Sequence, residues 1–203
     1  MKILYGTGNS EKLKQMEKII KINNFDVELV GLKDINFHED IVEDGTTFEE
    51  NSKIKADVIR KYCDENGYHD YIIVTDDAGL CVDKLGGAPG VYSARYAGDH
   101  APQEVTLKKL LDNLKSYSNP EERTAKLVCV LTASMPDNRV IVSRGELNGK
   151  LALEVKKYGG LTYEPIFIPD GYDKPIGEMS IDEFAKVKNH RDIAVLNLFD
   201  KLK

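Results

Sequence analysis

The sequence predicts a protein of the α/β class, in which strands and helices alternate around an open sheet. Lys2–Gly6 has the pattern of a strand, and a glycine-containing loop and a helical pattern from Glu11 follow it. Tyr71–Val74 is a short apolar, β-branched run, as expected of a central strand that is covered on both faces. Ala125–Thr132 and Val140–Ser143 flank a turn, which predicts a hairpin.

Length and charge narrow the class of function. With 203 residues, of which 41% are hydrophobic, the chain is long enough for one domain, or one domain with a small lobe. The net charge is −6 and no block of like charge occurs, so a nucleic-acid polymer is not an expected partner. An acidic protein that handles phosphates must place its cations locally or use a metal ion.

The cysteines and the apolar runs predict a cytoplasmic protein. Cys63, Cys81 and Cys129 are odd in number and lack metal-ligand spacing, so reduced thiols in the cytosol are expected. The first residues contain too short an apolar stretch for a signal peptide. The longest apolar run, near Leu127–Ala133, is too short to span a bilayer, so no membrane partner is expected.

The first loop has the features of a phosphate-binding site. A strand, a glycine loop and a helix in succession direct backbone N–H groups and the positive end of a helix at one point. Lys12 falls in the first helical turn, where a cation is unfavourable unless an anion lies nearby. Thr7, Asn9 and Ser10 precede it, and Asn9 or Ser10 is suited to cap the helix. These four residues are candidates for a polyphosphate cradle, although a plain turn with an exposed lysine has the same pattern.

A second group of candidates surrounds an acidic loop, Glu39–Gly45. Thr47–Glu50 is a capping box that starts a helix. Asn51 and Lys55 lie one turn apart on the same face of that helix. Lys55 could meet a phosphate, or it could belong to a solvated helix face. Either Glu43 or Asp44 on the loop could add a metal ligand.

Two adjacent carboxylates, Asp76 and Asp77, follow the buried run Tyr71–Val74. Like charges this close repel unless a cation or a proton lies beside them, and open α/β sheets bind ligands at the ends of such strands. Because side chains alternate along a strand, the two cannot both face the core while the chain stays extended. We therefore expect the strand to end here and one or both carboxylates to hold a divalent metal. A solvated turn capped by either aspartate is the alternative.

Later segments carry further candidates. Gly86–Gly98 is rich in glycine, which suits a lid, a binding loop or a subunit contact. Pro102–Leu114 has the pattern of an amphipathic helix. His190 and Arg191 lie in the first turn of a final helix, where cations lack a partner unless an anion or an electron-rich base edge is present. Surface ion pairs are the alternative for both residues.

Taken together, these segments resemble the inosine triphosphate pyrophosphatase family, enzymes that remove non-standard purine nucleotides. The match runs from Thr7 to the last helix, which is nearly the whole chain. Its most specific stretch is Asp76–Leu80 together with Leu85–Gly98. Shorter motifs fit at Thr7–Lys12, Phe48–Lys55, Pro165–Phe167 and His190–Arg191.

The resemblance implies a fold, an activity and an assembly. Residues 1–203 would form one nucleoside-triphosphate pyrophosphatase domain, with a long mixed central β-sheet flanked by helices and two lobes with a cleft between them. The implied activity is the Mg²⁺-dependent hydrolysis of ITP, dITP or XTP to the monophosphate and pyrophosphate. Members are usually homodimers, so a homodimer is expected.

The resemblance also implies residue roles. Asp77 would be the base that orients water, and Glu43 and Asp77 would bind Mg²⁺ with Asp76 close by. Asn51 belongs to a matching motif, and Ala78 stands at the position of a substrate-contacting serine. The residues implied to hold the triphosphate are Thr7, Gly8, Asn9, Ser10, Glu11, Lys12 and Lys55. The residues implied to surround the base are Leu161, Thr162, Tyr163, Glu164, Lys174, His190 and Arg191.

Three departures from the family pattern bear on selectivity. Ala78 replaces the usual serine and removes a hydroxyl contact. Leu161–Glu164 replaces Phe-Gly-Tyr/Trp-Asp, and a leucine cannot stack on a purine as phenylalanine does. Asn189 stands where a serine usually precedes the His-Arg pair. A related pyrophosphatase with altered base preference and a catalytically weak nucleotide-binding protein are therefore the alternatives.

Overall fold

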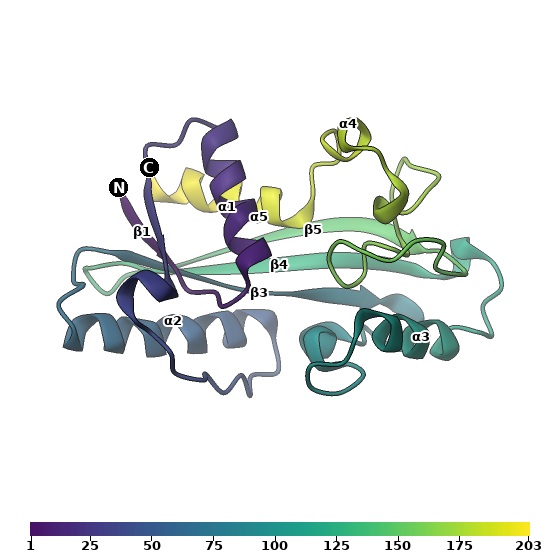
Figure 1. Cartoon of the computed structure of the whole chain (residues 1–203), viewed down its shortest axis with the longest axis horizontal. Coiled ribbons are helices and arrows are strands. Elements are labelled where there is room, and N and C mark those ends of the chain that lie inside the picture. Colours follow the sequence, from purple (N-terminus) through teal and green to yellow (C-terminus); the bar gives the residue numbers. More distant parts are fainter. The chain divides into compact units, whose positions relative to one another are not determined.

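The computed structural model describes residues 1–203 and contains one six-stranded β-sheet with the strand order β2-β1-β3-β4-β5-β6 (Figure 1). β1 pairs in parallel with β2 and with β3, whereas β5 pairs antiparallel with β6. The predicted α/β class with a mixed sheet is therefore confirmed. The strands are β1 (Lys2–Tyr5), β2 (Glu28–Gly31), β3 (Ile72–Val82), β4 (Thr124–Ser134), β5 (Val140–Leu151) and β6 (Phe167–Pro169).

Five α-helices flank the sheet, and three of them begin at side-chain caps. Asn9 caps the first helix, and Thr47 and Ser180 form capping boxes at the second and fourth. These starts agree with the patterns of polar residues in the sequence. No helix has the length and apolar character needed to cross a bilayer. The helices are α1 (Ser10–Ile22), α2 (Phe48–Glu65), α3 (Gln103–Asn113), α4 (Ile181–Phe184) and α5 (His190–Leu202).

The chain forms two compact units, and each is described by itself. Unit 1 comprises residues 1–77, 129–145 and 191–203. In this unit α1 and α5 lie on one face of the sheet and α2 lies on the other (Figure 1). The core beneath α2 is apolar and contains Leu4, Ile35, Phe37, Ile59, Cys63 and Ile73. Unit 1 thus has a helical cover on each face of its strands.

Unit 2 comprises residues 78–128 and 146–190. Helix α3 contributes Leu107 and Leu110 to its core. The same core contains Leu80 and Val82 from β3, and Tyr163 from the segment that precedes β6. This shared core fixes α3 and that segment against the same strands.

Strand β3 differs from its prediction. The sequence predicts that the strand ends before Asp76, but β3 continues without a break from Ile72 to Val82. That prediction was wrong because each aspartate finds polar partners on its own face of the sheet, so the backbone can stay extended. Thr75 directly precedes the aspartates. Its hydroxyl donates to the carbonyl of Ser52 on α2 at 2.6 Å, and the hydroxyl of Ser52 donates to the carbonyl of Thr75 at 3.2 Å.

Candidate active site

Gly6 joins β1 to the first loop at a point of close backbone approach. Its N–H donates to the carbonyl oxygen of Val74 at 2.7 Å. A Cβ at Gly6 would lie 2.4 Å from Ile59 Cδ1 and 2.8 Å from Thr75 Cγ2. Only glycine therefore lets the end of β1 pass this close to β3 and α2, and this contact fixes where the following loop begins.

The next loop contains the predicted phosphate-binding residues Thr7, Gly8 and Asn9, and Ser10 is the first residue of α1. Asn9 Oδ1 accepts the N–H groups of Glu11 at 2.9 Å and Lys12 at 3.3 Å, which confirms Asn9 as the helix cap. The N–H groups of Gly8 and Ser10 have no acceptor within the protein. The exposed loop therefore keeps two backbone donors beside the positive end of a helix, an arrangement suited to an anion.

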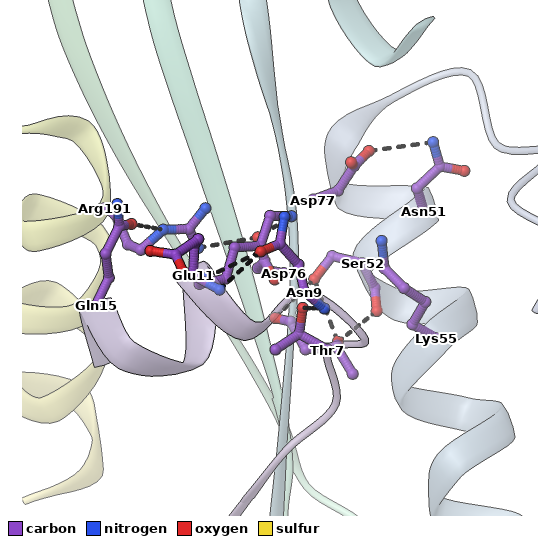
Figure 2. A network of polar contacts seen from close by, with 12 residues as sticks. Thr7, Asn9, Glu11, Gln15, Asn51, Ser52, Lys55, Asp76, Asp77 and Arg191 are labelled. Carbon is purple, nitrogen blue, oxygen red and sulfur yellow. Dashed lines mark hydrogen bonds and ion pairs between the residues drawn. The ribbon is translucent and has the colours of Figure 1, made fainter. Parts of the chain in front are cut away.

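Asp76 lies in a buried network on the face of the sheet that α1 and α5 cover (Figure 2). Its Oδ2 is 2.8 Å from Lys12 Nζ and 2.9 Å from Arg191 Nη1. The hydroxyl of Tyr5 donates to Asp76 Oδ1 at 3.0 Å and accepts from Arg191 Nη1 at 2.9 Å. Arg191 Nε donates to Gln15 Oε1 at 3.0 Å. The network thus joins β1, β3, α1 and α5 inside unit 1.

The charges around Asp76 determine its ionisation. Burial alone would raise the pKa of this carboxyl, but Lys12, Arg191 and Lys55 outweigh burial and hold the pKa well below its ordinary value. Asp76 is therefore ionised at neutral pH and fixes the ammonium of Lys12. The Lys12 side chain keeps 24% of its surface exposed, and an ammonium has three donors. Lys12 can consequently hold Asp76 and a phosphate oxygen at once.

Asp77 points to the opposite face of β3, toward α2 (Figure 2). The fully buried Asn51 donates through Nδ2 to Asp77 Oδ2 at 3.1 Å. Asn51 Oδ1 accepts the N–H of Gly45 at 2.9 Å, and a Cβ on Gly45 would lie 2.7 Å from this oxygen. Asn51 thus connects Asp77 to the acidic loop that carries Glu43. A contact between Asn51 and substrate stays a prediction.

Glu43 and Lys55 form an ion pair beside Asp77, with 2.5 Å between Lys55 Nζ and Glu43 Oε2. Burial raises the pKa of Asp77, the charge of Lys55 opposes this, and the charge of Glu43 raises the pKa further. These electrostatic interactions place Glu43, Lys55 and Asp77 in one cluster. The cluster brings together two predicted metal ligands and a predicted phosphate-binding lysine.

The cluster offers two carboxylates, those of Glu43 and Asp77, which is within the number that Mg²⁺ usually takes from a protein. No group of three or more His, Cys, Asp or Glu side chains is arranged to hold a metal. Asp76 contacts two cations on the other face of β3, so it does not complete a three-carboxylate site with Glu43 and Asp77. Mg²⁺ usually takes one or two protein carboxylates plus substrate phosphates, and it would relieve the repulsion between Glu43 and Asp77.

The predicted base-binding segment Leu161–Glu164 forms a closed turn in unit 2. The N–H of Leu161 donates to Glu164 Oε2 at 2.9 Å, and the N–H of Glu164 donates to the carbonyl of Leu161 at 3.1 Å. Burial raises the pKa of Glu164, and the bond from Leu161 opposes this. The hydroxyl of the buried Tyr163 donates to the carbonyl of Ser93 at 2.8 Å. The Glu164 carboxylate thus closes its own turn, while Leu161 and Thr162 stay half-buried.

The other residues predicted to surround the base, Lys174, His190 and Arg191, differ in burial and in their ionic partners. Lys174 pairs with Glu183 of α4 at 2.7 Å. His190 is buried at the start of α5, and Arg191 is only 2% exposed. The alternative of a surface ion pair is therefore wrong for Arg191, because its pair with Asp76 is buried. Contacts of these residues with a base stay predictions.

Comparison with known proteins identifies the family. A profile of the Ham1 family matches residues 3–201. The chain belongs to the Ham1 family. A dITP/XTP pyrophosphatase of Clostridium perfringens is 39% identical over 202 residues, covering 100% of this chain and 97% of that protein. A dITP/XTP pyrophosphatase of Bacillus subtilis is 36% identical over 189 residues, covering 93% of this chain and 91% of that protein.

Solved structures of the Ham1 family agree with this fold. The Ham1 protein of Staphylococcus aureus superposes with a TM-score of 0.83 at 31% identity, over 100% of this chain and 98% of its own. The resemblance stated from the sequence motifs is therefore confirmed, as is the long mixed sheet that it implied.

Two polar residues of this Ham1 family member were not indicated by its motifs. Tyr5 ends a buried strand, and a buried tyrosine needs a hydrogen-bonding partner for its hydroxyl. The position of Tyr5 therefore indicated that a polar residue would lie beside it. Gln15 lies in the middle of α1, and nothing in the local sequence distinguishes it from other polar helix residues. Both act through their bonds to Arg191 and so help to hold Asp76 and Lys12 in place.

Proposed function

We propose that this protein hydrolyses ITP, dITP and XTP to the monophosphate and pyrophosphate with the help of Mg²⁺. The observation that supports the proposal is that unit 1 places Lys12 beside Asp76 and the Glu43–Lys55 ion pair beside Asp77, at two adjacent residues of β3. Two ammonium groups match a polyphosphate, and two carboxylates match a hard divalent cation. The names of the full-length relatives, dITP/XTP pyrophosphatases, support the choice of substrate.

The lysines and the carboxylates of the cluster have different proposed tasks. Lys12, Lys55 and the backbone donors of the first loop hold the triphosphate and stabilise the pyrophosphate that leaves. Glu43 and Asp77 would hold Mg²⁺, which when bound neutralises phosphate oxygens and polarises the phosphorus under attack. Asp77 orients the attacking water and accepts its proton, while Asn51 fixes the direction of the Asp77 carboxylate.

Base selectivity would rest on the purine 6-position. Inosine and xanthosine bases carry a carbonyl acceptor there, whereas adenine carries an amino donor. Donors of the protein that meet this carbonyl would be left unpaired or mispaired by adenine, and an unpaired buried donor is costly. The proposed sources of these donors are Lys174 and the backbone of Leu161–Glu164, both in unit 2.

A substrate panel tests the proposal. Pyrophosphate release is measured for ITP, XTP, dITP, GTP and ATP, each with Mg²⁺ and again with EDTA. We expect release from ITP, dITP and XTP at least about tenfold faster than from ATP, and none in EDTA. Absence of pyrophosphate release from all five nucleotides would contradict the proposal and favour a nucleotide-binding role without catalysis.

A pyrophosphatase with a different base preference is the second candidate. It is favoured by Leu161, which lacks an aromatic face, and by Glu164, whose carboxylate bonds to its own turn. The same panel extended to UTP and CTP separates the two candidates. Faster release from either pyrimidine than from ITP would favour this second function.

We also propose a homodimer in the cytoplasm, with no nucleic-acid polymer and no membrane as partner. None of the three cysteines forms a disulfide, and burial raises the pKa of Cys63 and of Cys129 to about 11. Protonated, unbridged thiols are usual in a reducing compartment. Sedimentation equilibrium of the purified chain tests the dimer, and a mass equal to that of one chain at all concentrations would exclude it.

A further inference from the structure

Gln103, the first residue of α3, bonds to the predicted base-binding segment through both ends of its side-chain amide. Nε2 donates to the carbonyl oxygens of Leu161 at 3.1 Å, Gly159 at 3.2 Å and Thr162 at 3.3 Å. Oε1 accepts the N–H of Gly159 at 3.0 Å. One amide therefore bonds to four backbone groups within residues 159–162, with one of its two N–H hydrogens shared between two carbonyls, and none of these residues belongs to a helix or strand.

These bonds determine the direction of neighbouring N–H groups. In a planar trans peptide, the carbonyl of one residue and the N–H of the next point in opposite directions. Because the carbonyls of Leu161 and Thr162 point at Gln103, the N–H groups of Thr162 and Tyr163 point away from it. Neither of these two N–H groups has an acceptor within the protein. The turn thus presents two backbone donors on the side opposite α3.

Packing of α3 in the core of unit 2 fixes the position of Gln103. Helix α3 is anchored by Leu107 and Leu110, which lie in the same core as Tyr163 and Ile166. The segment is held from its other end by the bond of Tyr163 to the carbonyl of Ser93. Between these anchors, the residues before Tyr163 are exposed or half-buried, so packing contributes little to their conformation.

We propose that Gln103 is a positioning residue for base recognition, which fixes the backbone of residues 159–162 so that two N–H donors face the purine. This inference rests on the function proposed above and identifies how selectivity is set. Hydrogen-bond donors fit the carbonyl at the purine 6-position and reject the amino group of adenine. Loss of the clamp would let the segment adopt conformations that present carbonyls as well as N–H groups, so discrimination would fall.

Two substitutions and one matched control test this role. Gln103→Met keeps the length of the side chain but removes all four hydrogen bonds. Gln103→Glu keeps an acceptor for the N–H of Gly159 but directs a carboxylate oxygen at three carbonyl oxygens. Because these oxygens repel one another, this variant should disturb residues 159–162 more than Gln103→Met does. Glu104→Gln is the control, because Glu104 is the next residue of α3 and is exposed.

Hydrogen exchange gives a readout that does not depend on catalysis. Amide exchange across residues 159–164 should accelerate by about tenfold or more in Gln103→Met and stay unchanged in Glu104→Gln. Steady-state kinetics give the second readout, the ratio of kcat/KM for ITP to that for ATP. This ratio should fall by about tenfold in Gln103→Met and further in Gln103→Glu, mainly through a higher KM for ITP.

The two readouts separate the possible failures. Unchanged exchange in both Gln103 variants would overturn the clamp. Accelerated exchange with an unchanged ITP-to-ATP ratio would overturn the link between the clamp and selectivity. A wild-type protein that releases no pyrophosphate from any purine nucleotide would instead overturn the proposed function, while the exchange data would still test the clamp.

Discussion

Asp76 and Asp77 are neighbours on β3, yet their surroundings have opposite effects on a carboxylate. On the face covered by α1 and α5, Asp76 is bonded by Lys12, Arg191 and Tyr5, and these partners favour its charged form. On the α2 face, Asp77 is buried and accepts a hydrogen bond from the neutral amide of Asn51, and burial together with the charge of Glu43 outweighs the opposing charge of Lys55. The first setting stabilises a charge and the second disfavours it.

The difference shows how one strand can serve stability and chemistry at once. Side chains alternate between faces, so adjacent positions can differ completely in electrostatics without a break in the strand. A carboxylate whose charge is disfavoured gains from a cation or a proton, which is what a metal ligand or a general base requires. We therefore propose that Asp77 takes part in the reaction and that Asp76 supports Lys12.

The largest expected effect on activity is that of Asp77→Asn. Because the amide can neither accept a proton nor hold Mg²⁺ as a carboxylate does, pyrophosphate release from ITP should fall by about 10²–10⁴-fold. Triphosphate binding, measured by calorimetry, should largely persist through Lys12 and Lys55. In the wild type, activity should be lost on acidification at a pH above the ordinary pKa of aspartate, because burial raises the pKa of Asp77. Near-normal turnover by the variant would reject the role of Asp77.

Asp76→Asn should instead reduce stability. It leaves Arg191 buried beside a neutral partner, and removing one member of a buried pair costs about 3–5 kcal/mol in the free energy of unfolding. The folded pKa of Asp76 is depressed, so its contribution is fully present above the unfolded pKa of about 3.9 and is lost as the pH falls below it. Urea unfolding should therefore show a large difference from wild type at pH 7 and a smaller one near pH 3. An equal difference at both pH values would contradict the ion-pair account.

Lys55→Met tests whether the charge beside Asp77 on the α2 face contributes to activity. Loss of one of the two ammonium groups proposed to bind the triphosphate should lower kcat/KM for ITP by about 10²-fold. Lys53→Met is the matched control, since Lys53 lies on the same helix and forms an exposed pair with Asp57. This control should change kcat/KM by less than about twofold. Equal losses in the two variants would show that general electrostatics, rather than the site, explains the effect.

Tyr5→Phe should have the smallest effect. It removes the hydroxyl that lies between Arg191 and Asp76 but leaves their direct ion pair intact. The expected loss is about 1 kcal/mol in the free energy of unfolding, measured by urea titration, with pyrophosphate release almost unchanged. A loss as large as that of Asp76→Asn would mean that the hydroxyl, not the ion pair, holds the network together.

Local signals explain what the sequence could predict. Asn9 and Thr47 cap helices through residues three positions away or fewer, so their roles were visible in short patterns. The phosphate-binding and metal-binding candidates were indicated by the position of lysines in helical turns and by adjacent carboxylates after a buried run, and the motifs of a known family gave them roles. The continuation of β3 through Asp76 and Asp77 was missed, since it depends on partners far away in the chain.

Contacts between residues far apart in the chain explain the features that the sequence could not predict. Arg191 reaches Asp76 across 115 positions and Gln15 across 176, and no local pattern encodes such contacts. The same holds for Gln103, which meets Leu161 across 58 positions. The His-Arg motif predicts that Arg191 lies beside the base, and the fold places Arg191 in the buried network with Asp76.

The most direct test of this account is the sign of the stability change for the same substitution at the two adjacent aspartates. Urea unfolding is measured at pH 7 with EDTA for wild type, Asp76→Asn and Asp77→Asn. Because the raised pKa of Asp77 means that its charge is disfavoured in the folded state, Asp77→Asn should leave the free energy of unfolding unchanged or increase it. Asp76→Asn should lower it by about 3–5 kcal/mol. Equal destabilisation by both substitutions would contradict the division of roles between the two faces of β3.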